Sequence, residues 1–257
     1  MDVLALPAEP LALPELHGTG AMARYLVGAA VWAPSVHNTQ PWWFSAGGQE
    51  ISLHADPGRR LAVADPAGRE MMISCGAALF TVRLALRALG WIPESCVLPD
   101  PGRPLLVARV GWQRRAPATE YELRLFRQVL RRRTHRGGFD PLPVAPSLLT
   151  VLQESAERDG AMLRIVADEG ARAALAAAVE TAERALRRDS ARVRELAAWA
   201  PPPGSTRRDG VPPTAYPADT EASARTFRAG TSLMAAGGAS PGSVRERRLG
   251  PPVSYAC

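Results

Sequence analysis

The 257-residue sequence predicts a fold of the α+β class, and three observations support this prediction. Several long segments carry apolar residues at helical spacing. Shorter apolar runs that are typical of strands lie between them, and two of these runs form a candidate hairpin. The composition, 46% apolar and 22% charged residues, is that of an ordinary globular protein and excludes a wholly disordered or collagen-like chain.

The first predicted elements are a helix and a β-hairpin. A helix is expected over residues 18–32, where several apolar side chains share one face, and Pro34 ends it. Strands are expected over 41–46 and 50–56. Two glycines separate these runs, and glycine accepts the positive φ that tight hairpin turns require. A turn is expected over 56–59.

A long helix, a strand and a second helix should follow. Asp65 and Pro66 provide an N-cap and a first-turn proline for a helix that reaches about Gly90. The run 103–112 has the pattern of a strand. A helix is expected over 119–133, because a threonine begins it and two acidic residues in its first turn complement the helix dipole.

The second part of the chain repeats the helical pattern more weakly. Helices are expected over 146–158, 170–188 and 191–200, and a strand over 161–168. A run of three prolines at 201–203 ends the last helix.

These elements suggest two successive halves and a tail. The first half is expected over 18–128 and the second over 129–220, with the join near residues 130–140. Residues 221–257 are rich in Pro, Gly, Ser and Arg and show no sustained period. We therefore expect this tail to be disordered or poorly packed.

The positive charge of the chain comes entirely from arginine. All 31 basic residues are arginines, and the formal net charge is +6. Such a surplus predicts anionic partners: a phosphate group, a nucleic acid or a membrane surface. Ten of the arginines lie within residues 101–140 beside only three acidic residues. No nucleic-acid-binding module accompanies this cluster, which disfavours the nucleic-acid interpretation.

The sequence predicts a cytoplasmic protein. Its proline-broken leader does not resemble a signal peptide, and the apolar stretch 71–89 contains two arginines, so we expect a buried helix and no membrane span. Three cysteines without a C-x-x-C spacing favour a reducing compartment. The four histidines lack metal-ligand spacing, so no metal site is expected.

Two segments carry the candidate chemistry. Residues 33–42, A-P-S-V-H-N-T-Q-P-W, place a hydroxyl and two amides on a turn between two prolines. Such side chains can hydrogen-bond a planar heterocycle, or they can simply close a helix. Residues 132–136, R-R-T-H-R, offer guanidinium groups that can bind phosphate with two hydrogen bonds. Arginines at a helix C-terminus also interact favourably with its dipole.

The first segment resembles the A-P-S-x-x-N-x-Q-P-W signature of the FMN-dependent nitroreductase family, and it matches every specified position. The second resembles that family's R-R-[ST]-x-R phosphate-binding motif. The arginine motif follows the asparagine motif by about a hundred residues. This order resembles the Acg-type branch, in which one chain contains two nitroreductase-like halves. The resemblance implies a pseudo-dimeric, nitroreductase-like fold that binds FMN between the halves.

The resemblance also implies a set of cofactor-binding residues. FMN phosphate would be bound by Arg132, Arg133, Thr134 and Arg136, and the isoalloxazine or ribityl part by Pro34, Ser35, Asn38 and Gln40. Val36 stands where the family usually has a second serine. The flavin supplies the chemistry in such enzymes, so no catalytic side chain is expected.

The resemblance implies an oxidoreductase that transfers electrons from NAD(P)H through FMN to a small acceptor, such as a nitroaromatic compound or a quinone. A monomer with two halves or a homodimer would suit this function. Residues 221–257 lack the pattern of the family's last third, so the second half is expected to be truncated or divergent. Two alternatives are a non-catalytic FMN-binding or sequestering protein, including a truncated pseudoenzyme, and a basic nucleic-acid-associated protein.

Overall fold

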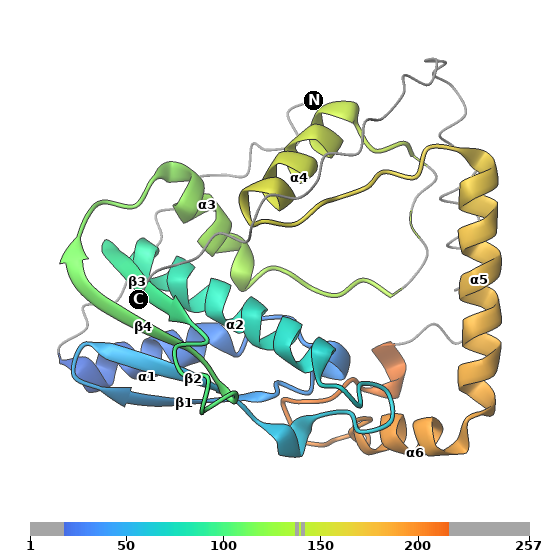
Figure 1. Cartoon of the computed structure of the whole chain (residues 1–257), viewed down its shortest axis with the longest axis horizontal. Helices are drawn as coiled ribbons and strands as arrows, with labels where there is room; N and C mark the ends of the chain where they lie inside the picture. Colours follow the sequence, from blue (N-terminus) through green and yellow to red (C-terminus); the bar gives the residue numbers. More distant parts are fainter. Residues whose placement is uncertain (1–17, 137–138, 140–141, 216–257) are drawn as a thin grey trace. The chain divides into compact units, whose positions relative to one another are not determined.

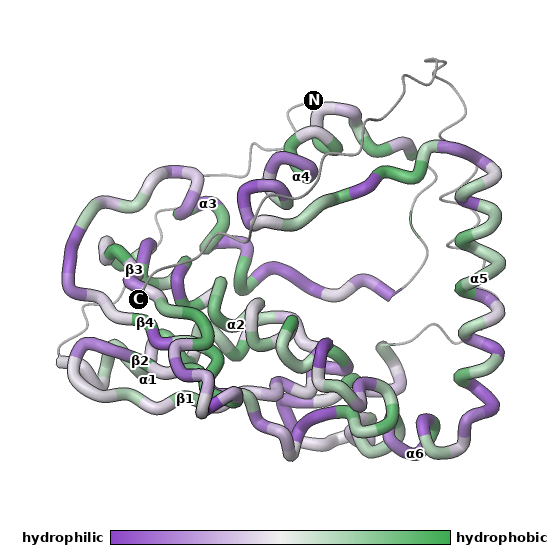
Figure 2. Tube along the Cα trace, in the orientation of Figure 1, coloured by the Kyte–Doolittle hydropathy of each residue, from purple (hydrophilic) through white to green (hydrophobic). Residues whose placement is uncertain are grey.

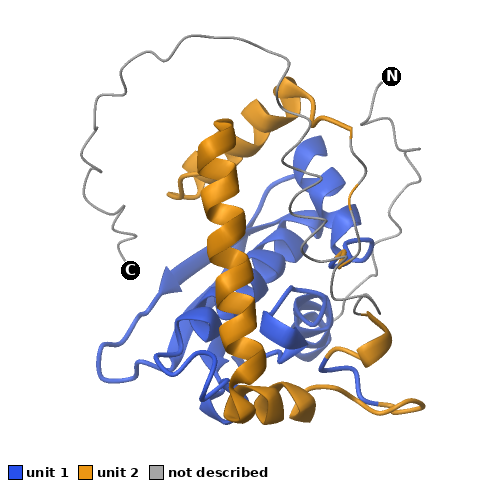
Figure 3. Ribbon diagram, turned by 90° about the vertical axis from the view of Figure 1, so that its right-hand side faces the viewer, with its two compact units in different colours: residues 1–134, 207–210, 256–257 blue, residues 135–206, 211–255 orange. Residues whose placement is uncertain are grey.

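The structure is a computed structural model that describes residues 18–136, 139 and 142–215 (Figure 1). The predicted tail 221–257 lies outside the described residues. Two compact units make up the described chain (Figure 3). The first contains residues 18–134 together with 207–210, and the second contains the remaining described residues. Each unit is described by itself below.

A four-stranded antiparallel sheet forms the framework of the first unit, with the strand order β1-β2-β4-β3. The strands are β1 (Trp42–Gly47), β2 (Glu50–Ala55), β3 (Trp91–Val97) and β4 (Leu106–Arg115). The predicted hairpin is confirmed: Trp42 pairs with Ala55, and Gly47 pairs with Glu50. Gly48 has a φ of 57°, a value at which glycine carries no Cβ penalty.

Three helices belong to the first unit: α1 (Thr19–Ala30), α2 (Arg69–Ala88) and α3 (Glu120–Val129). Helices α1 and α2 pack against each other, and both contact the sheet. The core lies between them, where Leu26 of α1, Leu86 of α2 and Leu53 of β2 are almost completely buried. The mixture of helices and an antiparallel sheet is compatible with the predicted α+β class.

Helix α2 begins later than the sequence predicts. Asp65 and Pro66 do not cap it directly, because the helix starts at Arg69 and Gly68 occupies the N-cap in a left-handed conformation. The Asp65 carboxylate still serves this end of the helix, since it accepts a hydrogen bond of 2.8 Å from the backbone N–H of Met71. A short turn therefore separates the predicted cap from the helix.

Helix α2 is the central helix of the core. Among the described helices, it alone is long and apolar enough to cross a membrane, yet 56% of that apolar stretch is buried inside the protein. Its buried residues face α1 and the sheet. This burial explains the apolar composition without a lipid environment.

Strand β3 is not predicted by the sequence analysis. Strand β3 contains Pro93, which cannot donate a backbone hydrogen bond, and the register with β4 shifts between Ile92 and Glu94. Proline is tolerated here because β3 lies at the sheet edge. The predicted strand 103–112 exists as β4, shifted toward the C-terminus.

The second unit contains three helices, α4 (Pro146–Arg158), α5 (Glu169–Arg188) and α6 (Ser190–Ala198), which confirm the three helices predicted there. The predicted strand 161–168 is wrong. This segment is apolar at several positions (Figure 2), but it forms no ladder. All strands of the described residues belong to the first unit, and an extended segment without a neighbouring strand cannot form ladder hydrogen bonds.

Helix α3 is fixed by an ion pair with α2. Thr119 and Glu122 form the capping box that begins α3. The Glu122 carboxylate also accepts hydrogen bonds from Arg87 of α2, at 2.8 Å from Nε and 3.1 Å from Nη2. These bonds hold the pKa of Glu122 at about 2, well below its usual value.

The depressed pKa predicts a pH-dependent contribution to stability. Because the folded protein favours ionised Glu122, its contribution is complete above pH 4.5 and disappears as the pH falls toward 2. Glu122→Gln retains the capping box but removes the charge. We expect it to lower the free energy of unfolding by about 1 kcal/mol at pH 7, measured by urea denaturation.

The control for this prediction is Glu120→Gln, because Glu120 is 80% exposed and its ion pair with Arg124 spans 3.7 Å. Exposed pairs of this kind contribute little. The difference in the free energy of unfolding between Glu122→Gln and the wild-type protein should decrease below pH 4.5. An equal loss at pH 7 and at pH 3 would contradict the assignment.

Candidate functional site

The turn that follows α1, residues 34–41, has a strained backbone and is called the motif turn below. His37, Asn38 and Gln40 have φ values of 48°, 53° and 46°. Among the described residues, only one other non-glycine residue has a positive φ. Such conformations cost energy for residues with a Cβ, and they cluster at functional sites. The motif turn is therefore a candidate site on its backbone geometry alone.

Hydrogen bonds within the turn and from α2 maintain this conformation. The Ser35 hydroxyl oxygen accepts a bond of 3.0 Å from the backbone N–H of Gln40. The Ser74 hydroxyl oxygen of α2 accepts one of 3.3 Å from the N–H of Val36. Ser35, predicted as a flavin contact, thus also stabilises the turn that carries it.

Cys75 of α2 supports the end of the motif turn. Its thiol is completely buried and donates a hydrogen bond of 3.3 Å to the carbonyl of Pro41. Burial raises the pKa of this thiol to about 12. Cys75 is therefore a structural residue, because only the thiolate acts as a nucleophile.

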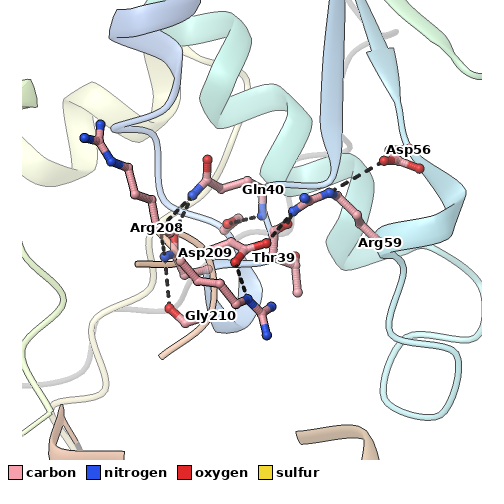
Figure 4. Close-up of polar contacts among 10 residues, drawn as sticks. Thr39, Gln40, Asp56, Arg59, Arg208, Asp209 and Gly210 are labelled. Atoms are coloured by element: carbon pink, nitrogen blue, oxygen red, sulfur yellow. Dashed lines mark hydrogen bonds and ion pairs between the residues drawn. The ribbon is translucent and has the colours of Figure 1, made fainter. Parts of the chain in front are cut away.

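The side chains of the motif turn bind a distant segment, residues 207–210, which is called the strap below. The Asn38 amide donates two hydrogen bonds, to the carbonyls of Arg208 at 3.1 Å and Gly210 at 3.0 Å. The Gln40 amide donates to the same Arg208 carbonyl at 3.1 Å (Figure 4). Gly210 returns a backbone bond of 3.0 Å to the Asn38 carbonyl. Asn38 is the chain's only asparagine, and both donors of its amide nitrogen are used in holding the strap, while its amide oxygen accepts a bond of 3.5 Å from Gln40.

An ionic cluster joins the strap to the predicted turn 56–59. Arg59 donates to the Thr39 carbonyl at 2.8 Å and to the Asp209 carboxylate at 3.0 Å (Figure 4). Arg207 donates to the other carboxylate oxygen at 2.9 Å. Hydrogen bonds from Arg207 and Arg59 hold the pKa of Asp209 below its usual value. The carboxylate therefore stays ionised at neutral pH and ties the strap to the motif turn.

A pocket of about 550 Å³ opens beside these groups. It lies within the first unit, and its size is in the range of small-molecule sites. Apolar and aromatic side chains dominate its wall, and a few polar groups converge on it. The lining residues are Val27, Val31, Gln40, Trp42, Trp43, Phe44, Arg59, Arg208 and Asp209.

One aromatic residue of the pocket is held by a neighbouring histidine. Trp43 is half exposed, and its ring stacks on His54 of β2 with the centroids 3.8 Å apart. His54 lies 3.0 Å from the Ser45 hydroxyl. Burial, together with the charge of Arg103, lowers the pKa of His54, so this ring is neutral at pH 7. The stack fixes the orientation of Trp43 at the pocket.

The arginine motif meets the end of α1. Arg132 donates a hydrogen bond of 3.2 Å to the carbonyl of Trp32, and the Arg133 guanidinium lies 5.2 Å from the centre of the Trp32 ring. The Arg132 guanidinium also donates a hydrogen bond of 3.4 Å to the hydroxyl oxygen of Thr134. Trp32 lies two residues before the first residue of the motif turn, so these three residues of the arginine motif lie near its beginning. Arg136 belongs to the second unit, and its position relative to the motif turn is not defined.

Sequence analysis misses several residues of this site. It predicts the turn that contains Arg59 but assigns that arginine no role. Arg208 and Asp209 lie in a proline-rich loop about 170 residues after the motif turn, and no local pattern indicates the contact. The adjacent opposite charges at 207–209 and Gly210, whose φ is 81°, are the only local signs of an ordered loop.

Comparison with known proteins gives three relatives, all from Mycobacterium tuberculosis. The chain is 36% identical over 143 residues to "Putative NAD(P)H nitroreductase Rv3131", and the match covers 56% of this chain and 41% of the relative. It is 31% identical over 187 residues to "Putative NAD(P)H nitroreductase acg", and the match covers 73% of this chain and 56% of the relative. It is 32% identical over 204 residues to "Uncharacterized protein Rv3127", and the match covers 78% of this chain and 58% of the relative. No family model matches the chain.

Two of these three relatives are named as putative NAD(P)H nitroreductases, and their similarity supports the nitroreductase family. The chain spans about half the length of the relatives that it matches.

The hydrogen bonds of Asn38 predict how the strap responds to substitution. In Asn38→Asp a carboxylate without N–H groups faces two carbonyl oxygens. We expect the peptide 205–211 to exchange its amide hydrogens at least tenfold faster, measured by mass spectrometry. Loss of the two bonds destabilises the strap by about 1–3 kcal/mol.

The matched control is Gln128→Glu, which makes the same chemical change at an exposed position of α3. It should leave exchange of the 205–211 peptide unchanged. Wild-type exchange rates in Asn38→Asp would contradict the role of Asn38 in holding the strap.

Proposed function

We propose that this protein is an FMN-binding, nitroreductase-like oxidoreductase of the Acg type. It transfers electrons from NAD(P)H through FMN to a small acceptor, such as a nitroaromatic compound or a quinone. The observation that carries the proposal is the proximity of the two motifs: Arg132 donates a hydrogen bond to the carbonyl of Trp32, two residues before the strained motif turn. The names of the relatives provide independent support.

The charges of the arginine motif fit a phosphate group. Arg132 and Arg133 are exposed, and neither forms an ion pair with an acidic residue among those the structure describes. The hydrogen bonds of Arg132 and Arg133 go to backbone carbonyls and to Thr134. A guanidinium has five N–H donors, so both retain donors for the oxygens of a phosphate. We assign the FMN phosphate to these two arginines with Thr134 and Arg136.

The polar atoms of the motif turn fit the flavin ring system. The Gln40 amide nitrogen donates to the Arg208 carbonyl of the strap and to the side-chain oxygen of Asn38, while the Gln40 side-chain carbonyl oxygen remains an available acceptor beside the pocket. Ser35 accepts a bond from Gln40 and still has its hydroxyl proton to donate. We assign contacts with the isoalloxazine or ribityl part to Ser35, Gln40 and Pro34. Asn38 contributes by holding the turn and the strap in position.

FMN, when bound, supplies the electron-transfer chemistry between NAD(P)H and the acceptor. The chain's own residues bind the cofactor and orient it, and we assign no side chain a catalytic role. In this proposal the protein acts in the cytoplasm, and its two halves correspond to residues 18–128 and 129–220. A monomer or a homodimer then provides the site.

The proposal predicts that FMN binding depends on the arginine motif. The purified protein, incubated with excess FMN, should remain yellow after gel filtration, and NADPH should bleach the flavin under anaerobic conditions. The double variant Arg132→Ala/Arg136→Ala should bind FMN at least a hundredfold more weakly, because each guanidinium–phosphate bond contributes about 1.5–3 kcal/mol. Fluorescence titration with FMN measures this loss.

Arg124→Ala is the control, because Arg124 is exposed on the same arginine-rich stretch and, among the described residues, forms its ion pair with Glu120. It should bind FMN as the wild-type protein does. A colourless wild-type protein would contradict the proposal. Retention of FMN by the double variant would contradict the site assignment. A yellow protein that NADPH fails to bleach would be the non-catalytic flavin-binding alternative.

A further inference from the structure

The strap presents one arginine whose charge has no partner. Asp209 is already paired with Arg59 and Arg207. The guanidinium of Arg208 makes no hydrogen bond or ion pair with any described residue, and in Figure 4 it extends away from Asp209. The backbone at Arg208 is nevertheless fixed, because its carbonyl accepts two amide hydrogen bonds. A cation on a fixed stretch of backbone therefore lines the pocket without a counter-charge among the residues that the structure describes.

The electrostatic balance at this point favours an anion. Three arginines of the cluster, at positions 59, 207 and 208, face two aspartates: Asp209, which pairs with Arg59 and Arg207, and Asp56, which lies 3.7 Å from Arg59. The cluster therefore keeps one positive charge more than it has negative charges, and Arg208 is the arginine that neither aspartate pairs with. Asp209 stays ionised because its pKa is depressed, yet it offsets only one of the three positive charges. A planar guanidinium binds a carboxylate through two parallel hydrogen bonds, which gives direction as well as affinity.

The rest of the pocket wall is suited to a flat ring. Trp42, Trp43 and Phe44 are consecutive residues of β1, and all three line the pocket. Trp43 is half exposed and fixed by its stack with His54. Aromatic faces and edges bind planar rings through offset or edge-to-face contacts.

We propose that this pocket binds a planar aromatic carboxylate, with Arg208 recognising the carboxylate and the β1 aromatic residues contacting the ring. Arg208 is then a specificity-determining residue, and Asn38 and Gln40 are positioning residues that hold its backbone. That such a molecule is the electron acceptor rests on the proposed function. The binding preference itself rests only on the pocket.

The test compares 4-nitrobenzoate with 4-nitrobenzamide, which has a similar shape but no charge. Isothermal titration calorimetry on the full chain, with and without added FMN, should show at least tenfold tighter binding of 4-nitrobenzoate. Arg208→Ala should remove this preference and leave the affinity for 4-nitrobenzamide unchanged. Arg208→Lys keeps the charge without the planar fork and should retain only part of the preference.

Arg24→Ala is the matched control, because Arg24 is exposed on α1 and does not line the pocket. It should retain the full preference. The Arg208 variants should fold normally, since its side chain bonds no described residue. Equal affinities of the wild-type protein for the two compounds would overturn the proposal, as would an unchanged preference in Arg208→Ala. Displacement of 4-nitrobenzoate by FMN would also overturn it, by assigning the pocket to the flavin.

This test separates the binding proposal from the proposed function. A preference for 4-nitrobenzoate that depends on Arg208 supports the pocket even where NADPH fails to bleach FMN, and in that case only the proposed function is wrong. Flavin bleaching without any preference between the two compounds leaves the proposed function standing and overturns the pocket assignment.

Discussion

The first unit depends on one constrained stretch of backbone, the motif turn. A left-handed conformation costs on the order of 1 kcal/mol or more for a residue with a side chain, and three such residues lie within four positions. The turn keeps this conformation because α2 supports it: Ser74 accepts a bond near its beginning and Cys75 donates one at its end. The resulting geometry directs the amides of Asn38 and Gln40 toward the same carbonyl.

Two distant segments are organised around this turn. The strap reaches it from about 170 residues further along the chain and brings a pocket-lining arginine and aspartate with it. The arginine motif reaches the end of α1, just before the turn, through the Arg132–Trp32 hydrogen bond. Cationic groups of the strap therefore line the pocket beside the motif turn, and those of the arginine motif contact Trp32, which precedes the turn. A flavoprotein requires phosphate-binding groups and a surface for a planar ring in this kind of proximity.

Much of the fold could be predicted from sequence, because helix periodicity and capping are local; Thr119, for example, caps α3 as its sequence context predicts. Two strands show the limits of local information. The edge strand β3 was not predicted from the sequence, because Pro93 interrupts the strand pattern. Residues 161–168 have the composition of a strand but no described strand to pair with. The site shows the same limit. Asn38 was predicted as a site residue, but its bonds to the strap depend on a long-range contact, as does the position of Arg208.

Hydrogen exchange of the wild-type protein with and without FMN tests the central claim most directly. The claim is that the motif turn and the arginine motif form one cofactor site, although about a hundred residues separate them in the sequence. Saturating FMN should slow amide exchange in two separate peptides, 32–41 and 130–136, and both effects should show the same dependence on FMN concentration. Protection of only one of these peptides, or of neither, would contradict the account.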